Sequence, residues 1–260
     1  MAKAKRKGAA RIVEGILIGI VIVCLVGIGA IALQYYLQAQ RYSDLSGKVY
    51  TGEEAALGGD LARMTVDWDA LREEAPDAIG WIVVPDTVIN YPIVQGPDNE
   101  YYLHRSYDGE TSWLSTGGTI FLDAGNKGDF SDMNNVLYGH HMNDGSMFAF
   151  LARLTNQGEF ESNRTIYVLT PTMNYRLETF SVVLTVGSDE IVKTSFGTAE
   201  EFAEYIQDKV DRNVVEVNDF VADASSISKI FMLVTCEYSN NDGRACVFAY
   251  VTEQAAPLSE

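Results

Sequence analysis

Three residues that lie far apart in the sequence could together carry out acyl transfer. Cys236 ends an apolar run, Arg244 follows it by eight positions, and His140 belongs to a distant upstream fragment. A thiol attacks a carbonyl only as its thiolate, and a nearby imidazole and guanidinium both favour that form. Arg244 also offers a rigid fork of N–H donors, which suits a substrate carbonyl or a developing oxyanion. These residue types therefore predict cysteine-dependent acyl transfer.

The histidines favour this chemistry over a metal site. His140 and His141 are adjacent, and neighbours on an extended segment point to opposite sides, so only one can face Cys236. The third histidine, His104, lies in a different segment, and no spacing typical of zinc ligands occurs. We expect a structural or surface role for His104, no metal and no cofactor.

The N-terminus carries a membrane signal. Residues 15–33 include no charged residue, and as a helix they would span about 28 Å, close to the hydrocarbon core of a bilayer. Five basic residues precede this run, which puts the N-terminus in the cytoplasm by the positive-inside rule. A cleavable signal peptide, cut near residues 30–32, is the alternative, but the apolar run is long for one.

We therefore expect a single-pass protein with its main domain outside the cell. The predicted parts are a basic cytoplasmic tail (1–11), a transmembrane anchor (12–33), a polar stalk (34–65) and a catalytic domain (66–260). Residues 34–260 contain 14 basic and 35 acidic residues, a formal net charge of −21. Such an acidic surface repels phosphate backbones, which excludes nucleic acid as a partner. We interpret the acidity as a source of solubility outside the cell.

A disulfide is the main alternative for the key cysteine. Cys24 lies in the apolar run, whereas Cys236 and Cys246 lie outside the membrane, where disulfides persist. A Cys236–Cys246 bridge fits the spacing of a hairpin and would make the chain a non-enzymatic, membrane-tethered binding domain. Against it, Cys246 opens a second apolar run that is typical of a core strand.

The pattern of the remaining chain is mainly β. Eight segments rich in β-branched and aromatic residues are separated by turn residues, and they predict a closed antiparallel barrel. The segments are 79–84, 87–94, 119–123, 135–138, 165–170, 175–186, 227–236 and 244–252. Three helices are expected: one through Glu74 that Asp67 caps, one over 147–154, and one over 198–212. Thr198 and Glu201 form a capping-box pattern at the start of the last helix.

The chain resembles the class B sortases, membrane-anchored cysteine transpeptidases of Gram-positive bacteria. The resemblance covers about residues 66–254 and runs in order through several blocks. These are Gly80-Trp81-Ile82, the segment 87–96, Asp98-Asn99-Glu100-Tyr101-Tyr102-Leu103, Gly118-Thr119-Ile120-Phe121-Leu122-Asp123, Tyr138-Gly139-His140, Asp144-Gly145-Ser146-Met147-Phe148, and Thr235-Cys236 with Arg244.

The resemblance implies a fold and a set of residue roles. The fold would be an eight-stranded sortase barrel with N-terminal helices and a helix between the penultimate strands. The Tyr-Gly-His motif selects His140, and His141 stands where the family commonly has Asn. Cys236 would attack a threonine carbonyl, Arg244 would stabilise the oxyanion, and His140 would protonate the leaving amine. Thr235 and Glu237 would line the substrate groove.

The resemblance also implies the partners. The donor would be a secreted protein with a C-terminal sorting motif, and the acceptor an amine on a cell-wall precursor or a pilin. The sequence does not assign the carboxylate that would orient His140; Asp123, Glu237 and Asp242 are the candidates. The rival enzyme class is the L,D-transpeptidases, whose His, Gly, Cys and Arg usually form one compact motif that is absent here.

Overall fold

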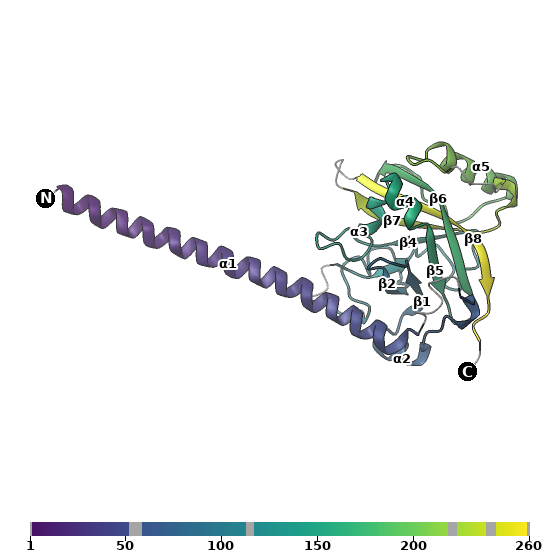
Figure 1. The fold of residues 1–260 in the computed structure, drawn as a ribbon, viewed down its shortest axis with the longest axis horizontal. Coiled ribbons are helices and arrows are strands. Elements are labelled where there is room, and N and C mark those ends of the chain that lie inside the picture. The colour runs from purple at the N-terminus through teal and green to yellow at the C-terminus, as the bar shows by residue number, and fades with distance from the viewer. Residues whose placement is uncertain (1, 52–58, 113–116, 218–222, 238–242, 259–260) are drawn as a thin grey trace. The chain divides into compact units, whose positions relative to one another are not determined.

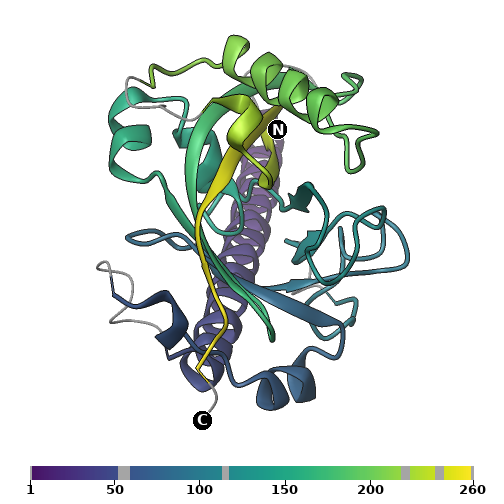
Figure 2. The ribbon, with the colours of Figure 1, turned by 90° about the vertical axis from the view of Figure 1, so that its right-hand side faces the viewer.

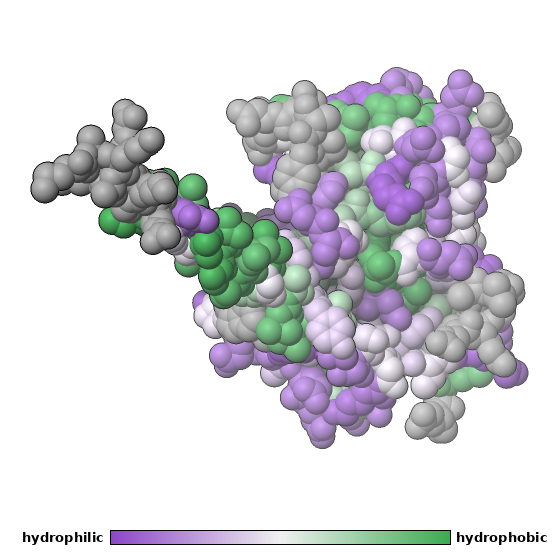
Figure 3. All heavy atoms as spheres, turned by 60° about the vertical axis from the view of Figure 1, so that its left-hand side comes forward, coloured by the Kyte–Doolittle hydropathy of each residue, from purple (hydrophilic) through white to green (hydrophobic). Residues whose placement is uncertain are grey.

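The computed structural model describes residues 2–51, 59–112, 117–217, 223–237 and 243–258, and it divides into two compact units at Arg41 and Tyr42. The first unit consists of most of helix α1 (Ala2–Val49), and the last turns of this helix belong to the second unit (Figure 1). Every residue from 12 to 33 is exposed, and Figure 3 shows apolar side chains gathered along this helix. Among the described residues, α1 is the one helix that is long and apolar enough to cross a membrane.

The second unit is built on a closed barrel of eight strands, as predicted. The strand order around the barrel is β1-β2-β3-β4-β7-β8-β6-β5. The strands are β1 (Ala78–Val83), β2 (Asn90–Val94), β3 (Ile120–Leu122), β4 (Asn134–Tyr138), β5 (Thr165–Leu169), β6 (Asn174–Val186), β7 (Ile230–Glu237) and β8 (Gly243–Ala255). All eight overlap the segments expected from the sequence.

The expectation of a purely antiparallel barrel is wrong for two pairs of strands. Strands β2 and β3 run parallel, as do β4 and β7. A hairpin turn can join only antiparallel neighbours, whereas parallel neighbours need a long crossover. The chain supplies such crossovers: residues 95–119 connect β2 to β3, and the elements from α3 to η3 separate β4 from β7.

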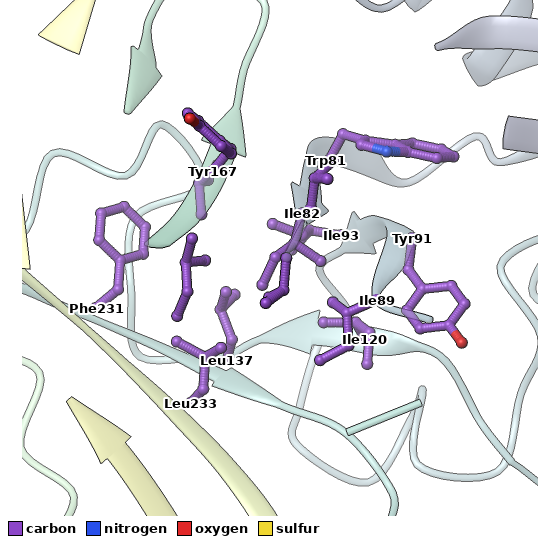
Figure 4. Packing of buried hydrophobic residues seen from close by; sticks show 14 of the residues in the cluster. Trp81, Ile82, Ile89, Tyr91, Ile93, Ile120, Leu137, Tyr167, Phe231 and Leu233 are labelled. Atoms are coloured by element: carbon purple, nitrogen blue, oxygen red, sulfur yellow. The ribbon is translucent and has the colours of Figure 1, made fainter. Parts of the chain in front are cut away.

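Two apolar clusters hold the barrel together, and β7 belongs to both. Figure 4 shows the larger cluster, where Trp81, Leu137, Phe231 and Leu233 pack with residues of neighbouring strands. The smaller cluster contains Met232 together with residues of β6, β8 and α5. Because successive residues of a strand point to opposite faces, β7 is buried on both sides, and its C-terminal end is firmly placed.

Short helices surround the barrel. They are α2 (Trp68–Glu74), α3 (Ala149–Arg153), α4 (Gln157–Ser162) and α5 (Ala199–Asp211), with 3-10 turns η2 (Leu61–Arg63) and η3 (Ala224–Ser226). Asp67 caps α2 by accepting a hydrogen bond from the backbone N–H of Ala70, and Thr198 caps α5, as expected. Helix α5 lies between β6 and β7 in the chain and packs on β6 (Figure 2). Helix α4 was not predicted, since its six residues are largely polar.

The end of α1 is part of the barrel unit. Tyr42, Leu45 and Val49 fall in the segment expected to be a stalk, yet all three are buried in the larger cluster. The hydroxyl of Tyr42 donates a hydrogen bond to the carbonyl oxygen of Gly118 (3.0 Å) and lies 2.8 Å from the hydroxyl of Thr119. These contacts tie the helix to the loop that precedes β3.

Candidate active site

His140 is held at the place where β4 meets β7. The N–H of Gly139 donates to the carbonyl of Val234 (3.1 Å), and the carbonyl of His140 accepts from the N–H of Phe148 (2.9 Å). A Cβ atom at Gly139 would lie 2.5 Å from Ile120 and 2.7 Å from Phe148, so only glycine fits beside His140. The glycine of the Tyr-Gly-His motif therefore lets the chain pass close to the barrel and fixes the backbone of His140.

The register of β7 and β8 pairs Cys236 with Arg244. This confirms the expectation that pairing of the two strands sets these residues side by side. For Cys236 and Glu237 the structure describes the backbone and not the side chain, and Asp242 lies outside the described residues. The register of the two strands therefore brings positions 236 and 244 together.

Cys246 is paired with Val234 and is a free, fully buried cysteine. Burial raises the pKa of its thiol to about 12, so Cys246 is not a nucleophile at neutral pH. The predicted alternative of a Cys236–Cys246 disulfide is therefore wrong, because the strand register aligns Cys246 with Val234 and places its thiol in the apolar cluster below α5.

One cavity of about 370 Å³ brings three of the predicted site residues together. His140, Thr235 and Arg244 line it, although they come from the end of β4, from β7 and from β8. Two further walls belong to residues 99–103 and 186–192. The described part of the barrel unit thus gathers an imidazole, a guanidinium and the residue before Cys236 around one space.

His141 faces elsewhere. It lines a separate cavity of about 700 Å³ together with Asp86, Asp144 and Arg153. The two adjacent histidines therefore open onto different cavities, as expected for neighbours on an extended segment. Of the two, it is His140 that shares a cavity with Arg244.

The ring of His140 has two neighbours that the sequence did not reveal. Its Nε2 lies 2.6 Å from the carbonyl oxygen of Leu103, and the ring of His104 stacks on it with 5.6 Å between centroids and 24° between planes. His104 is exposed and contacts another side chain, which agrees with the structural or surface role expected for it, but nothing in the sequence indicated that its partner would be His140. The contact arises because the loop after β2 folds back over the end of β4, which no local pattern indicates.

Burial is the main cause that lowers the pKa of His140 below its ordinary value. The hydrogen bond with Leu103 acts in the opposite direction, and the charge of His104 lowers the pKa further. Burial favours the neutral form of an imidazole, and no carboxylate among the described residues is hydrogen-bonded to His140. The lowered pKa therefore favours a neutral His140 ring at neutral pH.

Asp123 is a candidate for orienting His140, but it has other partners. Its Oδ2 accepts hydrogen bonds from the hydroxyl of Tyr138 (2.9 Å) and the side-chain amide of Asn99 (2.9 Å), and its Oδ1 accepts from the N–H of Gly125 (2.7 Å). Both Tyr138 and Asn99 line the cavity. In the described structure, Asp123 supports the cavity wall, and the group that contacts the ring nitrogen of His140 is a backbone carbonyl.

The wall formed by residues 186–192 is tied to α5. Asp189 accepts hydrogen bonds from the hydroxyl of Thr185 and from the guanidinium of Arg212, the residue that caps the C-terminus of α5. The bond from Thr185, and next the bond from Arg212, hold the pKa of Asp189 below its usual range. Thr235, which lines the same cavity, is buried, and its hydroxyl has no hydrogen-bond partner among the described residues. No group of three potential metal ligands occurs among those residues.

Comparison with known proteins defines the class. The sequence model of the family described as Sortase domain matches residues 82–252, so the chain belongs to the sortase family. It is 33% identical to sortase B of Listeria monocytogenes over 200 residues, which cover 76% of this chain and 78% of that one. It is 27% identical to sortase B of Staphylococcus aureus over 236 residues, covering 89% and 93%.

Solved structures point to the same class. Sortase B of Bacillus anthracis in complex with AAEK2 aligns with a TM-score of 0.70 at 31% identity, covering 84% of this chain and 96% of that one. The Clostridium perfringens sortase B aligns with a TM-score of 0.66 at 30% identity, covering 71% and 99%. Together these matches place the chain among the class B sortases, which are cysteine transpeptidases.

Proposed function

We propose that Cys236 is the nucleophile of a transpeptidation in which a C-terminal sorting motif is cleaved after threonine. The acyl group then passes to an amine on a cell-wall precursor or a pilin. The observation that carries this proposal is the pairing of Cys236 with Arg244 in the β7–β8 ladder, beside a cavity that His140 and Arg244 both line. Residues paired in an antiparallel ladder lie on the same face of the sheet, which would turn the thiol and the guanidinium toward one space.

The first half of the reaction forms a thioester. His140, neutral at rest, takes the proton of the Cys236 thiol, and the thiolate attacks the threonine carbonyl carbon. The carbonyl oxygen gains the negative charge, which the N–H fork of Arg244 and a backbone N–H stabilise. The C–N bond then breaks as His140 returns its proton to the leaving amine.

The second half transfers the acyl group. The incoming amine attacks the thioester carbon and passes a proton to His140, and the C–S bond breaks to restore the sulfur of Cys236. We propose that Thr235 and Glu237 line the groove for the sorting peptide. Thr235 supports this role because it is a cavity-lining residue whose buried hydroxyl lacks a partner among the described residues.

We also propose that residues 12–33 of α1 anchor the protein in the membrane, with residues 1–11 in the cytoplasm and the catalytic domain outside. The exposed apolar surface of α1 and the basic residues before it support this topology. Protease added to wall-stripped cells should digest residues 66–260 and leave the N-terminal tail protected. Digestion of the tail in intact cells, or a chain recovered in the soluble fraction, would contradict the topology.

The activity can be tested without knowing the motif. The full chain in detergent micelles is incubated with a peptide library in which threonine is fixed and its neighbours vary, and acyl adducts are located by mass spectrometry. We expect one adduct, on Cys236, that an added amine removes. His140→Ala should abolish the adduct, and His141→Ala, the matched control, should retain it. An adduct that persists in Cys236→Ala, or none from the whole library, would refute the proposal.

A further inference from the structure

The contact between His140 and Leu103 determines which ring nitrogen carries the proton. A carbonyl oxygen can only accept a hydrogen bond, so at 2.6 Å the Nε2 atom of His140 must be the donor. In the neutral imidazole the other nitrogen, Nδ1, then holds the free electron pair. Nδ1 is therefore the atom through which His140 can exchange a proton.

The residue that follows Leu103 contacts the face of the same ring. His104 stacks on His140 at a centroid distance of 5.6 Å, and the side chain of His104 is itself exposed. Two consecutive residues of one loop thus contact the ring of His140: the Leu103 carbonyl accepts a hydrogen bond from its Nε2, and the His104 ring stacks on its face. Among the described residues, the other charged groups that line the same cavity are Glu100, Asp189 and Arg244.

The carbonyl of Leu103 is itself held in place by a glycine. Gly118 has a φ of +56°, and a Cβ atom there would lie 2.4 Å from the carbonyl oxygen of Leu103. Next to it, the N–H of Thr119 donates to the carbonyl of Tyr102 (3.2 Å). The hydroxyl of Tyr42 donates a hydrogen bond to the carbonyl of Gly118. The loop over His140 is therefore packed against buried backbone.

We propose that Leu103 and His104 form the positioning element of His140, in which the Leu103 carbonyl fixes the tautomer and the His104 ring holds the imidazole plane. This proposal rests on the proposed role of His140 in proton transfer. A positive charge on His104 also opposes protonation of His140, in the same direction as burial does. His104 is in this view a positioning residue and not a catalytic one.

Two substitutions separate the ring of His104 from its charge. His104→Phe keeps a flat ring over His140 and removes the charge, whereas His104→Ala removes both. We expect His104→Ala to slow acylation of Cys236 about threefold to tenfold, the factor that corresponds to a lost aromatic pair. His104→Phe should restore most of that rate. In both variants the pKa of His140 should rise, which shifts the acidic limb of the pH–rate profile to higher pH.

The titration can be read directly, because the chain has three histidines. Carbon-13-labelled histidine in the full chain, in detergent micelles, gives three ring signals, which single substitutions assign. His141→Ala, whose side chain lines the other cavity, serves as the control and should change neither the rate nor the titration of His140.

Two results would overturn the proposal. One is a His104→Ala variant with the parent rate and an unchanged His140 titration. The other is a His104→Phe variant as slow as His104→Ala, since a ring that restores nothing does not act by stacking. The titration does not need turnover, so it tests the contact between His104 and His140 even if the His140→Ala variant is active. An active His140→Ala variant would count against the proposed function and not against this contact.

Discussion

Gly118→Ala should disable the enzyme from a position that does not line the cavity. The new Cβ atom would lie 2.4 Å from the carbonyl oxygen of Leu103 and 2.8 Å from that of Tyr102. An ordinary carbon–oxygen contact is about 3.3 Å, so the Leu103 carbonyl must retreat by about 1 Å. Both neighbours are backbone atoms, which cannot turn away as a flexible side chain could.

The displaced carbonyl is the one that accepts the hydrogen bond of His140. Either this bond of 2.6 Å breaks or the imidazole follows the carbonyl, and in both cases Nδ1 leaves its place. A misplacement of about 1 Å can cost about 10²-fold in rate, so we expect acylation of Cys236 to fall by about that factor. The positive φ of +56° adds a stability loss of about 1–2 kcal/mol, because alanine disfavours this region.

Gly145→Ala is the matched control for this strain. Gly145 also has a positive φ, +84°, but a Cβ atom there would meet nothing within 4 Å. Both variants should therefore melt at a lower temperature, and only Gly118→Ala should lose single-turnover acylation, measured by mass spectrometry at a temperature where both are folded. If Gly118→Ala acylates at the rate of Gly145→Ala, the Leu103 carbonyl does not control His140.

Three further predictions concern charge and burial. Arg244→Lys should lower turnover by about 10²–10³-fold without changing the melting temperature, since an ammonium lacks the N–H fork. Near-normal turnover would mean that Arg244 contributes only its positive charge. Arg212→Gln should cost about 0.2–1 kcal/mol at pH 7, because its ion pair with Asp189 is partly exposed. The pKa of Asp189 is lowered in the folded state, so this loss should fade below about pH 4 in denaturant titrations. A loss that persists at pH 3 would point to packing. Cys246 should resist iodoacetamide in the folded chain and react after unfolding; rapid native labelling would contradict its burial.

The sequence alone predicted the elements whose signals are local. Alternating apolar residues and turn residues indicate eight strands, and the caps Asp67 and Thr198 mark the starts of α2 and α5. The spacing of Cys236 and Arg244 across one turn also predicts their pairing, because a hairpin fixes its register by its own length. The apolar run at the N-terminus is equally local, since it depends only on composition and length.

The tertiary structure alone decided how distant segments meet. The parallel pairs β2–β3 and β4–β7 join strands that long crossovers separate, and strand patterns carry no information about such partners. The same holds for His104 and the Leu103 carbonyl, which reach His140 across 36 and 37 positions of the chain. Periodicity reports which face of an element is buried, whereas contacts between loops depend on how the closed barrel brings its ends together. The residues whose side chains could carry out the reaction are thus visible in the sequence, but the groups that contact the ring of His140 can be identified only from the folded barrel.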